Sequence, residues 1–237
     1  KVTFRDCKKR YEKRWIKGVD TDKTQFIKNQ KQDFWYSNIT IYNEKWGYCT
    51  PTSIAMIINY HHHIRKKKAT LYNLKTERRS RTNKLSHELA SKFGTSKQPG
   101  GGTPWESFRR VIPNTTKAKL RELGIKGYSY TWQTSKRNIG GQFNTIRYYI
   151  NKNNPVMLTS LKGARFDGFY QKYLHGSHSM PVIGYQQQYY KGVCYKKWRA
   201  KRSWLLVDTT WFSRAYIRFD NRGNYRKHSR VTYVRAY

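Results

Sequence analysis

The sequence predicts an α+β protein in which a central buried helix packs against an antiparallel β-sheet. The first observation is the segment from Thr50 to about His63, which is apolar on nearly all sides, as is typical of a buried helix. The second is order along the chain, because helical patterns come first and strand-like runs follow. The third is composition: 16% aromatic residues in a chain of 237 argue against disorder and supply a sizeable core.

Helical signals follow a polar, irregular lead-in over residues 1–37. Pro51 suits the first turn of the central helix, where its missing N–H costs nothing. The run from Thr103 to Glu106 (TPWE) matches a capping box with proline at the first helical position, and Gly94 and Gly124 are stop signals. We therefore predict helices at 50–63, 85–93, 104–111, 116–123 and 142–152.

Strand-like runs bounded by turn residues occupy the later part of the chain. They are Pro155–Leu161, Ser179–Gln187, Trp204–Thr209, Tyr216–Asp220 and Val231–Tyr237. No linker separates the helical part from these runs. Residues 38–237 are therefore predicted to form one domain.

Basic residues outnumber acidic ones by 49 to 13, which gives a formal net charge of +36. Such a charge attracts anionic polymers, among them nucleic acid, lipopolysaccharide, teichoic acid and anionic membrane, and salt screens it. The basic residues are spread along the chain, with tight runs at Arg65–Lys68 and Lys196–Arg202. No zinc-finger, RRM or basic-zipper pattern occurs. We therefore favour a general attraction to an anionic polymer or cell-envelope surface over a dedicated nucleic-acid site.

The three cysteines, Cys7, Cys49 and Cys194, are too few for a disulfide framework. One bridge, Cys7–Cys194, can coexist with a free Cys49. No apolar run reaches the length of about 18 residues that a transmembrane helix needs, so no membrane span is predicted. The sequence begins at Lys1 rather than Met, which agrees with removal of a leader or with a trimmed sequence.

A thiol stands directly before the most apolar helix. At a helix start, the dipole and the unpaired N–H groups of the first turn favour a thiolate, so Cys49 is a candidate nucleophile. Such a nucleophile needs a base and a group that orients the base. His178 directly precedes an apolar strand and is the candidate base, with His175 as a nearby competitor. Asp208 ends an apolar run, and a buried carboxylate needs a partner such as an imidazole N–H.

Each of these residues also has a purely structural interpretation. A cysteine on a buried helix is often a core residue, a histidine before a strand is often an ordinary core or surface residue, and an aspartate at a strand end is often a turn residue. The order Cys…His…Asp along one chain favours the catalytic interpretation.

The residues around Cys49 (GYCTPTSIAMIINY) resemble the nucleophile helix of C39-like cysteine peptidases of the papain-like superfamily. In that family a Cys-x-Pro-[Thr/Ser]-Ser-hydrophobic-Ala-Met pattern opens the central helix. HSMPVIGY, from His178, resembles the second family element, and WLLVDTTW, which holds Asp208, resembles the third. The similarity extends from about Asn38 to Trp211. It implies a papain-like peptidase domain over 38–237, a Cys49–His178–Asp208 triad and no metal or organic cofactor.

One departure from the family concerns the second oxyanion donor, which the family supplies from a glutamine upstream of the cysteine. The residue six positions before Cys49 is Asn43, and Asn38 lies further upstream. Both carry an amide on a shorter side chain. Loss of such a donor typically costs about 100- to 1,000-fold in rate, so an inactive relative stays open as an alternative.

Three further motifs have plainer interpretations. Consecutive residues on a helix point about 100° apart, so His61-His62-His63 cannot converge on one ion and is expected to form the polar end of the helix. Gly100–Gly102 lacks the Lys-Ser/Thr of a P-loop and is expected to be a flexible loop. Asn38 and Asn114 begin glycosylation sequons.

The sequence thus predicts a thiol-dependent hydrolase, most simply a cysteine peptidase that cleaves peptide bonds in protein or peptide substrates. Two alternatives stay open. The same triad can serve deamidation or acyl transfer in a toxin or effector, or the fold can be an inactive, cationic binding protein. The stand-alone C39-like resemblance and the absence of an initiating Met imply a secreted or cell-surface protein.

Overall fold

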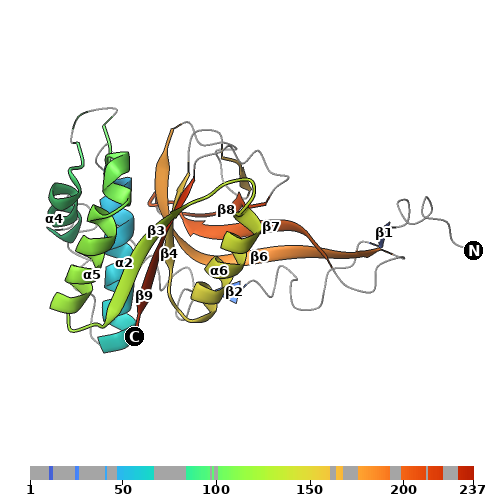
Figure 1. Ribbon diagram of the computed structural model, residues 1–237, viewed down its shortest axis with the longest axis horizontal. Helices are drawn as coiled ribbons and strands as arrows, with labels where there is room; N and C mark the ends of the chain where they lie inside the picture. The colour runs from blue at the N-terminus through green and yellow to red at the C-terminus, as the bar shows by residue number, and fades with distance from the viewer. Residues whose placement is uncertain are drawn as a thin grey trace, which may run out of the picture.

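The computed structural model describes residues 11–12, 25–26, 41, 47–66, 84–96, 98, 101–160, 164–167, 176–192, 199–211, 213–220 and 229–237, with the backbone alone at 11–12, 25–26, 188–192 and 199–201. This part of the chain is α+β, as predicted. One face of its sheet is covered by α2 (Cys49–Lys66), α4 (Lys84–Phe93) and α5 (Val111–Glu122), and the other by α6 (Ile139–Asn151) (Figure 1).

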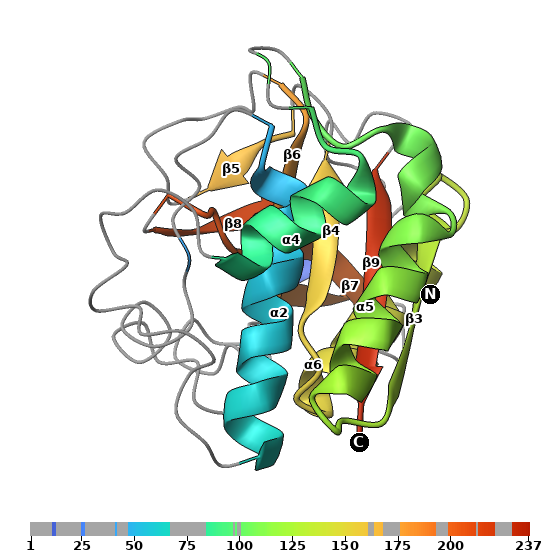
Figure 2. The ribbon, with the colours of Figure 1, turned by 90° about the vertical axis from the view of Figure 1, so that its left-hand side faces the viewer.

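Helix α2 is the central element of the helical layer. Its residues from Thr50 to His61 are all buried, because α4, α5 and the sheet enclose the helix (Figure 2). The chain enters α2 through Gly47, whose φ of +78° lies in the left-handed region that glycine tolerates. The Thr52 N–H then donates to the Tyr48 carbonyl at 3.0 Å. This hydrogen bond closes the first turn of the helix.

The sheet is antiparallel and its strands lie in the order β3-β9-β4-β6-β7-β8-β5. The strands are β3 (Gly127–Gln133), β4 (Val156–Ser160), β5 (Phe166–Asp167), β6 (His178–Gly192), β7 (Arg199–Asp208), β8 (Arg214–Arg218) and β9 (Arg230–Ala236). Two short segments of the lead-in, β1 (Tyr11–Glu12) and β2 (Gln25–Phe26), pair with β6. Strand β6 is therefore the centre of the sheet and the strand on which α2 packs.

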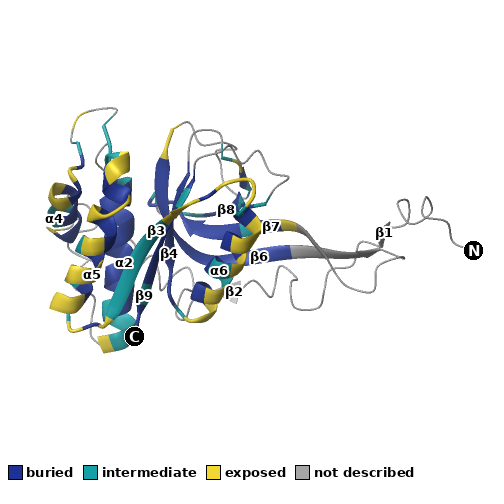
Figure 3. Cartoon of the chain, in the orientation of Figure 1, coloured by how far each residue is buried: buried dark blue, intermediate teal, exposed yellow. Residues whose placement is uncertain are grey.

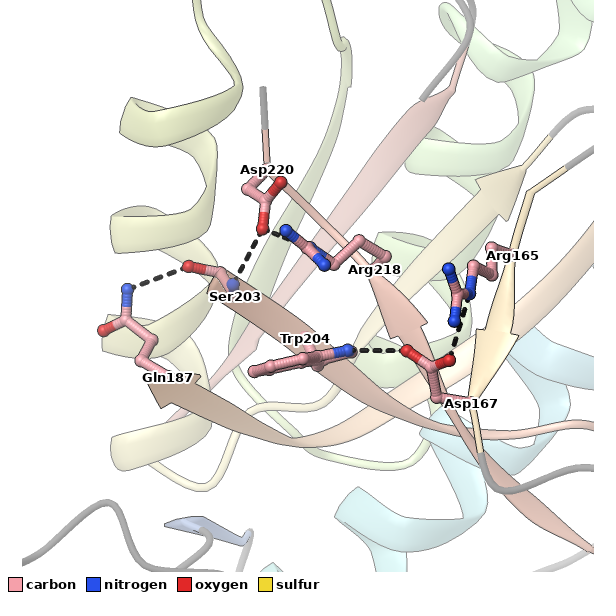
Figure 4. Close-up of polar contacts among 7 residues, drawn as sticks. All are labelled: Arg165, Asp167, Gln187, Ser203, Trp204, Arg218 and Asp220. Atoms are coloured by element: carbon pink, nitrogen blue, oxygen red, sulfur yellow. Dashed lines mark hydrogen bonds and ion pairs between the residues drawn. The ribbon is translucent and has the colours of Figure 1, made fainter. Parts of the chain in front are cut away.

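Two aspartates hold the edge formed by β7, β8 and β5 (Figure 4). Asp167 accepts the Trp204 indole N–H at 2.8 Å and pairs with Arg165 at 3.2 Å. Asp220 accepts the Ser203 backbone N–H at 2.9 Å and pairs with Arg218. Each carboxylate thus has a guanidinium and a second donor, as partly buried charges require.

The strand-like runs and the helices expected at 50–63, 85–93 and 142–152 are present with modest changes in their bounds. The capping box is not formed: Pro104 precedes a single 3-10 turn, η3 (Trp105–Phe108), without a side-chain cap. The Thr103 hydroxyl instead bonds to the Thr95 hydroxyl at 2.8 Å. Helix α5 consequently begins at Val111. Strands β3 and β5 were not predicted from the sequence.

Among the described residues, no helix combines the length and apolar character needed to cross a membrane. The proposed Cys7–Cys194 pair falls outside these residues. Cys49 is not part of a disulfide bond in the described residues.

Candidate active site

Cys49 is the first residue of α2 and is partly exposed. The helix begins there because Gly47 turns the chain and Pro51 needs no N–H partner in the first turn. A thiol at this position faces the N-terminal end of the helix dipole, which favours negative charge.

His178, the first residue of β6, forms a hydrogen bond with the Cys49 thiol. Burial alone raises the pKa of that thiol. The hydrogen bond and charge of His178, the Ser179 backbone N–H and the Thr50 hydroxyl lower the pKa by more, so that it lies at about 7. A substantial fraction of Cys49 is therefore thiolate at neutral pH.

The opposite side of the imidazole is held by the turn after β7. His178 Nε2 lies 2.8 Å from the Thr209 carbonyl oxygen and 3.3 Å from the Thr210 hydroxyl. A carbonyl oxygen can only accept, so Nε2 carries the proton and Nδ1 is the acceptor nitrogen of the neutral ring. The Trp211 indole stacks on the imidazole with ring centroids 4.2 Å apart and planes at 11°.

Asp208 is fully buried and organises this turn. Its Oδ1 accepts the Thr210 N–H at 2.8 Å. Thr210 has a φ of 64°, a left-handed conformation that costs a β-branched residue about 1–2 kcal/mol. Backbone and side-chain bonds from Thr209 to Ser213, at 2.8–2.9 Å, close the turn. The strained conformation therefore aims the Thr209 carbonyl at the imidazole.

A chain of buried hydroxyls joins the start of α2 to the start of β6. The Ser179 hydroxyl lies 2.8 Å from the Thr50 hydroxyl and 2.7 Å from the Thr159 hydroxyl. The Ser53 hydroxyl donates to the Ser179 carbonyl at 2.9 Å. Since Thr50 follows Cys49 and Ser179 follows His178, these bonds fix the thiol relative to the imidazole.

A glycine loop packs against the chain just before Cys49. A Cβ on Gly47 would lie 2.9 Å from the Gly101 carbonyl oxygen, and one on Gly101 would lie 2.4 Å from the Ser96 hydroxyl. The Gly102 carbonyl accepts the Ser96 N–H at 3.1 Å. Gly101, one of the residues expected to form a flexible loop, thus packs closely against the backbone two residues before Cys49.

The structure brings the expected nucleophile and base together. His178 Nε2 lies within hydrogen-bonding distance of the Thr209 carbonyl oxygen, and Asp208, the expected orienting acid, lies in the same turn. Asn38, Asn43 and His175 lie outside the described residues.

The residues that hold this pair carry little signal in the sequence. They are Ser179, Thr50, Ser53, Thr159, Thr209, Thr210 and Trp211. One signal was available for the helix: Thr50 and Ser53 stand three positions apart in an otherwise apolar segment, so their hydroxyls share one face. The turn gave no such signal, because its contacts depend on the left-handed Thr210.

The described residues contain no group of three or more His, Cys, Asp or Glu side chains arranged to hold a metal ion. The His61–His63 run also differs from the expected polar helix end. Helix α2 continues to Lys66, and His61 is fully buried, with its Nδ1 accepting from Arg65 Nε at 3.4 Å.

In this α+β fold, a thiol and an imidazole are in contact at the N-terminus of the central helix. This arrangement is expected of the cysteine-peptidase class. A family model described as the Peptidase_C39 like family matches residues 24–224. The match covers most of the chain, and the chain belongs to this peptidase family. No curated protein matches the chain.

Proposed function

We propose that the chain is a papain-like, thiol-dependent peptidase with Cys49 as nucleophile and His178 as general base. One observation carries the proposal: the thiol of Cys49 bonds to His178 and has a pKa of about 7. Membership of a peptidase family supports a peptide bond as the substrate.

The orientation of the imidazole determines the path of the proton. With Nε2–H donating to the Thr209 carbonyl, Nδ1 takes the thiol proton and the sulfur attacks the carbonyl carbon. The oxyanion is stabilised by the N–H groups at the α2 start and by an upstream amide, Asn43 or Asn38. The imidazolium returns its proton to the departing amine. Water, deprotonated by His178, then cleaves the thioester and restores the thiol.

Asp208 has a positioning role in this proposal, as the acid that orients the base. It holds the Thr210 N–H and so keeps the Thr209 carbonyl directed at Nε2. Asp208→Asn retains an oxygen acceptor for that N–H but removes the charge, whereas Asp208→Ala removes both. A larger loss of kcat in the alanine variant, with an unchanged pH profile in the asparagine variant, would indicate positioning.

The test of the proposed function is turnover of peptide and denatured-protein substrates, followed by mass spectrometry. Cys49→Ala should abolish cleavage, while His63→Ala, at the other end of α2, should leave it intact. Mass spectrometry separates a cut chain from a deamidated or acylated one. Undiminished cleavage by Cys49→Ala would refute the thiol mechanism, and modification without cleavage would indicate the amidase or acyl-transfer alternative.

A further inference from the structure

Aromatic side chains gather on β3, an edge strand of the sheet in the described part of the chain. Strand alternation places Tyr128, Tyr130 and Trp132 on one face, the face that α6 partly covers. Strand β3 is less buried than β9 and β4, which follow it in the sheet (Figure 3). Trp132 remains 57% exposed, and Tyr148 of α6 and the C-terminal Tyr237 remain 47% and 60% exposed. Exposed rings of this size are an unusual feature for a surface without a partner.

Arg235 lies among these rings. Its guanidinium is 4.9 Å from the Tyr237 ring centroid and 5.8 Å from that of Tyr128, and it donates to the Tyr128 hydroxyl at 3.3 Å. The hydrogen bond with Tyr128, together with the nearby Tyr237 and Tyr148, raises the pKa of Arg235. A permanent positive charge is thus held against aromatic faces.

The elements that form this edge carry basic side chains and lack acidic ones. Between Glu122 and Asp167 the sequence has no Asp or Glu but seven Lys or Arg residues. Residues 221–237 also contain no Asp or Glu. An anionic ligand therefore meets no opposing carboxylate side chain of β3, α6 or β9.

We propose that this aromatic–basic surface, defined by Tyr128, Tyr130, Trp132, Tyr148, Arg235 and Tyr237, binds single-stranded nucleic acid. Exposed bases stack on aromatic rings, and Arg and Lys contact the phosphates. The rings from Tyr128 to Trp132 span about 14 Å of strand, which is room for more than one base. A neutral glycan or peptide would gain little from the positive charge of this surface. A polyanion without aromatic rings would gain little from its aromatic side chains.

The experiment measures fluorescence anisotropy of a labelled oligothymidylate and of an abasic oligonucleotide of equal length. Trp132→Ala should weaken oligothymidylate binding by about 5- to 100-fold, because stacking on a ring is lost, and should leave abasic binding unchanged. Trp132→Phe should keep most of the affinity. Arg235→Gln should weaken both and reduce the slope of log K against log salt by about one.

Matched controls lie on the opposite face of the sheet. Trp105 is 38% exposed and stacks with Arg230, so Trp105→Ala removes a comparable exposed indole. Arg121, exposed on α5, gives Arg121→Gln with the same loss of charge. The variants Trp105→Ala and Arg121→Gln should bind like the parent chain, and so should Cys49→Ala, since the surface is independent of the thiol.

Equal affinity for the abasic strand and the oligothymidylate would overturn the proposal, because it would mean attraction to charge alone. Equal losses in Trp132→Ala and Trp105→Ala would overturn it as well. Since Trp132 is largely exposed, circular dichroism should show the Trp132 variants folded. Failure of the proposed peptidase activity would not alter any of these outcomes.

Discussion

Replacing His178 with alanine should shift the ionisation of Cys49 in a measurable way. In the parent chain, burial raises the pKa of the thiol. The contact with His178, together with smaller contributions from Ser179 and Thr50, lowers this pKa to about 7. His178→Ala removes the hydrogen bond and the positive charge together. We expect the pKa to return to at least about 8.5, the value of an ordinary thiol.

The size of the effect follows from the thiolate fraction. At pH 6 the fraction is about 9% for a pKa of 7 and about 0.3% for a pKa of 8.5, a loss of about 30-fold. A more basic thiolate is also more nucleophilic, with a Brønsted coefficient of about 0.4–0.5. An increase of the pKa from about 7 to about 8.5 therefore raises the rate constant of the thiolate about 5-fold, which offsets part of the loss. Alkylation of Cys49 at pH 6 should therefore slow by about 6-fold.

The assay is iodoacetamide labelling across a pH series, with Cys49 followed at the peptide level by mass spectrometry so that Cys7 and Cys194 do not interfere. The parent midpoint should lie near 7, and the His178→Ala midpoint well above 8. His63→Ala, which removes an imidazole from the other end of α2, is the control and should keep the parent midpoint. A midpoint near 7 in His178→Ala would refute the reasoning.

Three further substitutions test the parts that hold the site. Ser179→Ala should lower the free energy of unfolding by about 1–3 kcal/mol, because two buried threonine hydroxyls lose their partner, yet leave the Cys49 pKa near 7, since the backbone N–H remains. Gly47→Ala should lower the free energy of unfolding by more than about 1 kcal/mol, because Gly47 has a left-handed φ and a Cβ at this position would clash with the Gly101 carbonyl. The same substitution should slow labelling of Cys49. Burial, with Arg65, lowers the pKa of His61 to about 3. Neutral His61 therefore contributes fully to the free energy of unfolding above about pH 6.5, and this contribution is lost as the pH falls. Between about pH 6.5 and 5, the free energy of unfolding of the parent chain should fall by about 2 kcal/mol more than that of His61→Gln.

Urea denaturation at fixed pH measures the first two effects, and a pH series measures the third. Gly140→Ala is the control for Gly47→Ala, because Gly140 lies in α6 and a Cβ there meets nothing within 4 Å. That variant should be slightly stabilised. A pKa shift of Cys49 in Ser179→Ala, an unaffected Gly47→Ala, or parallel pH curves for the parent and His61→Gln would each contradict the corresponding contact.

The sequence predicts α2 and the later strands because their apolar residues follow the periods of buried elements. Strand β3 was missed for a physical reason. Its residues alternate aromatic with hydroxyl side chains (GYSYTWQ), and it lies at the edge of the sheet, so it lacks the aliphatic run that marks the buried strands. The alternation of Tyr128, Tyr130 and Trp132 with Ser129 and Thr131 is nevertheless a period-2 signal.

The candidate site shows the same division between local and tertiary information. Cys49 and His178 each begin an element, so local signals locate them. The contact of the imidazole with the Thr209 carbonyl depends on the left-handed Thr210, which is a threonine in a conformation that its type disfavours. No rule of local propensity predicts such a residue, because the surrounding hydrogen bonds hold it there.

The hydroxyls at the start of α2 explain why a helix buried on nearly every side still carries polar residues on one face. Apolar side chains at Thr50 and Ser53 would pack as well and would avoid the cost of buried polar groups. Apolar contacts, however, tolerate small sliding movements, whereas a hydroxyl left without its partner in the core is penalised. The Thr50–Ser179–Thr159 chain therefore fixes the helix on the strand in one register. For the proposed proton transfer from Cys49 to His178, a misplacement of about 1 Å can cost about 100-fold in rate, so a fixed register favours the reaction even where the buried hydroxyls reduce stability.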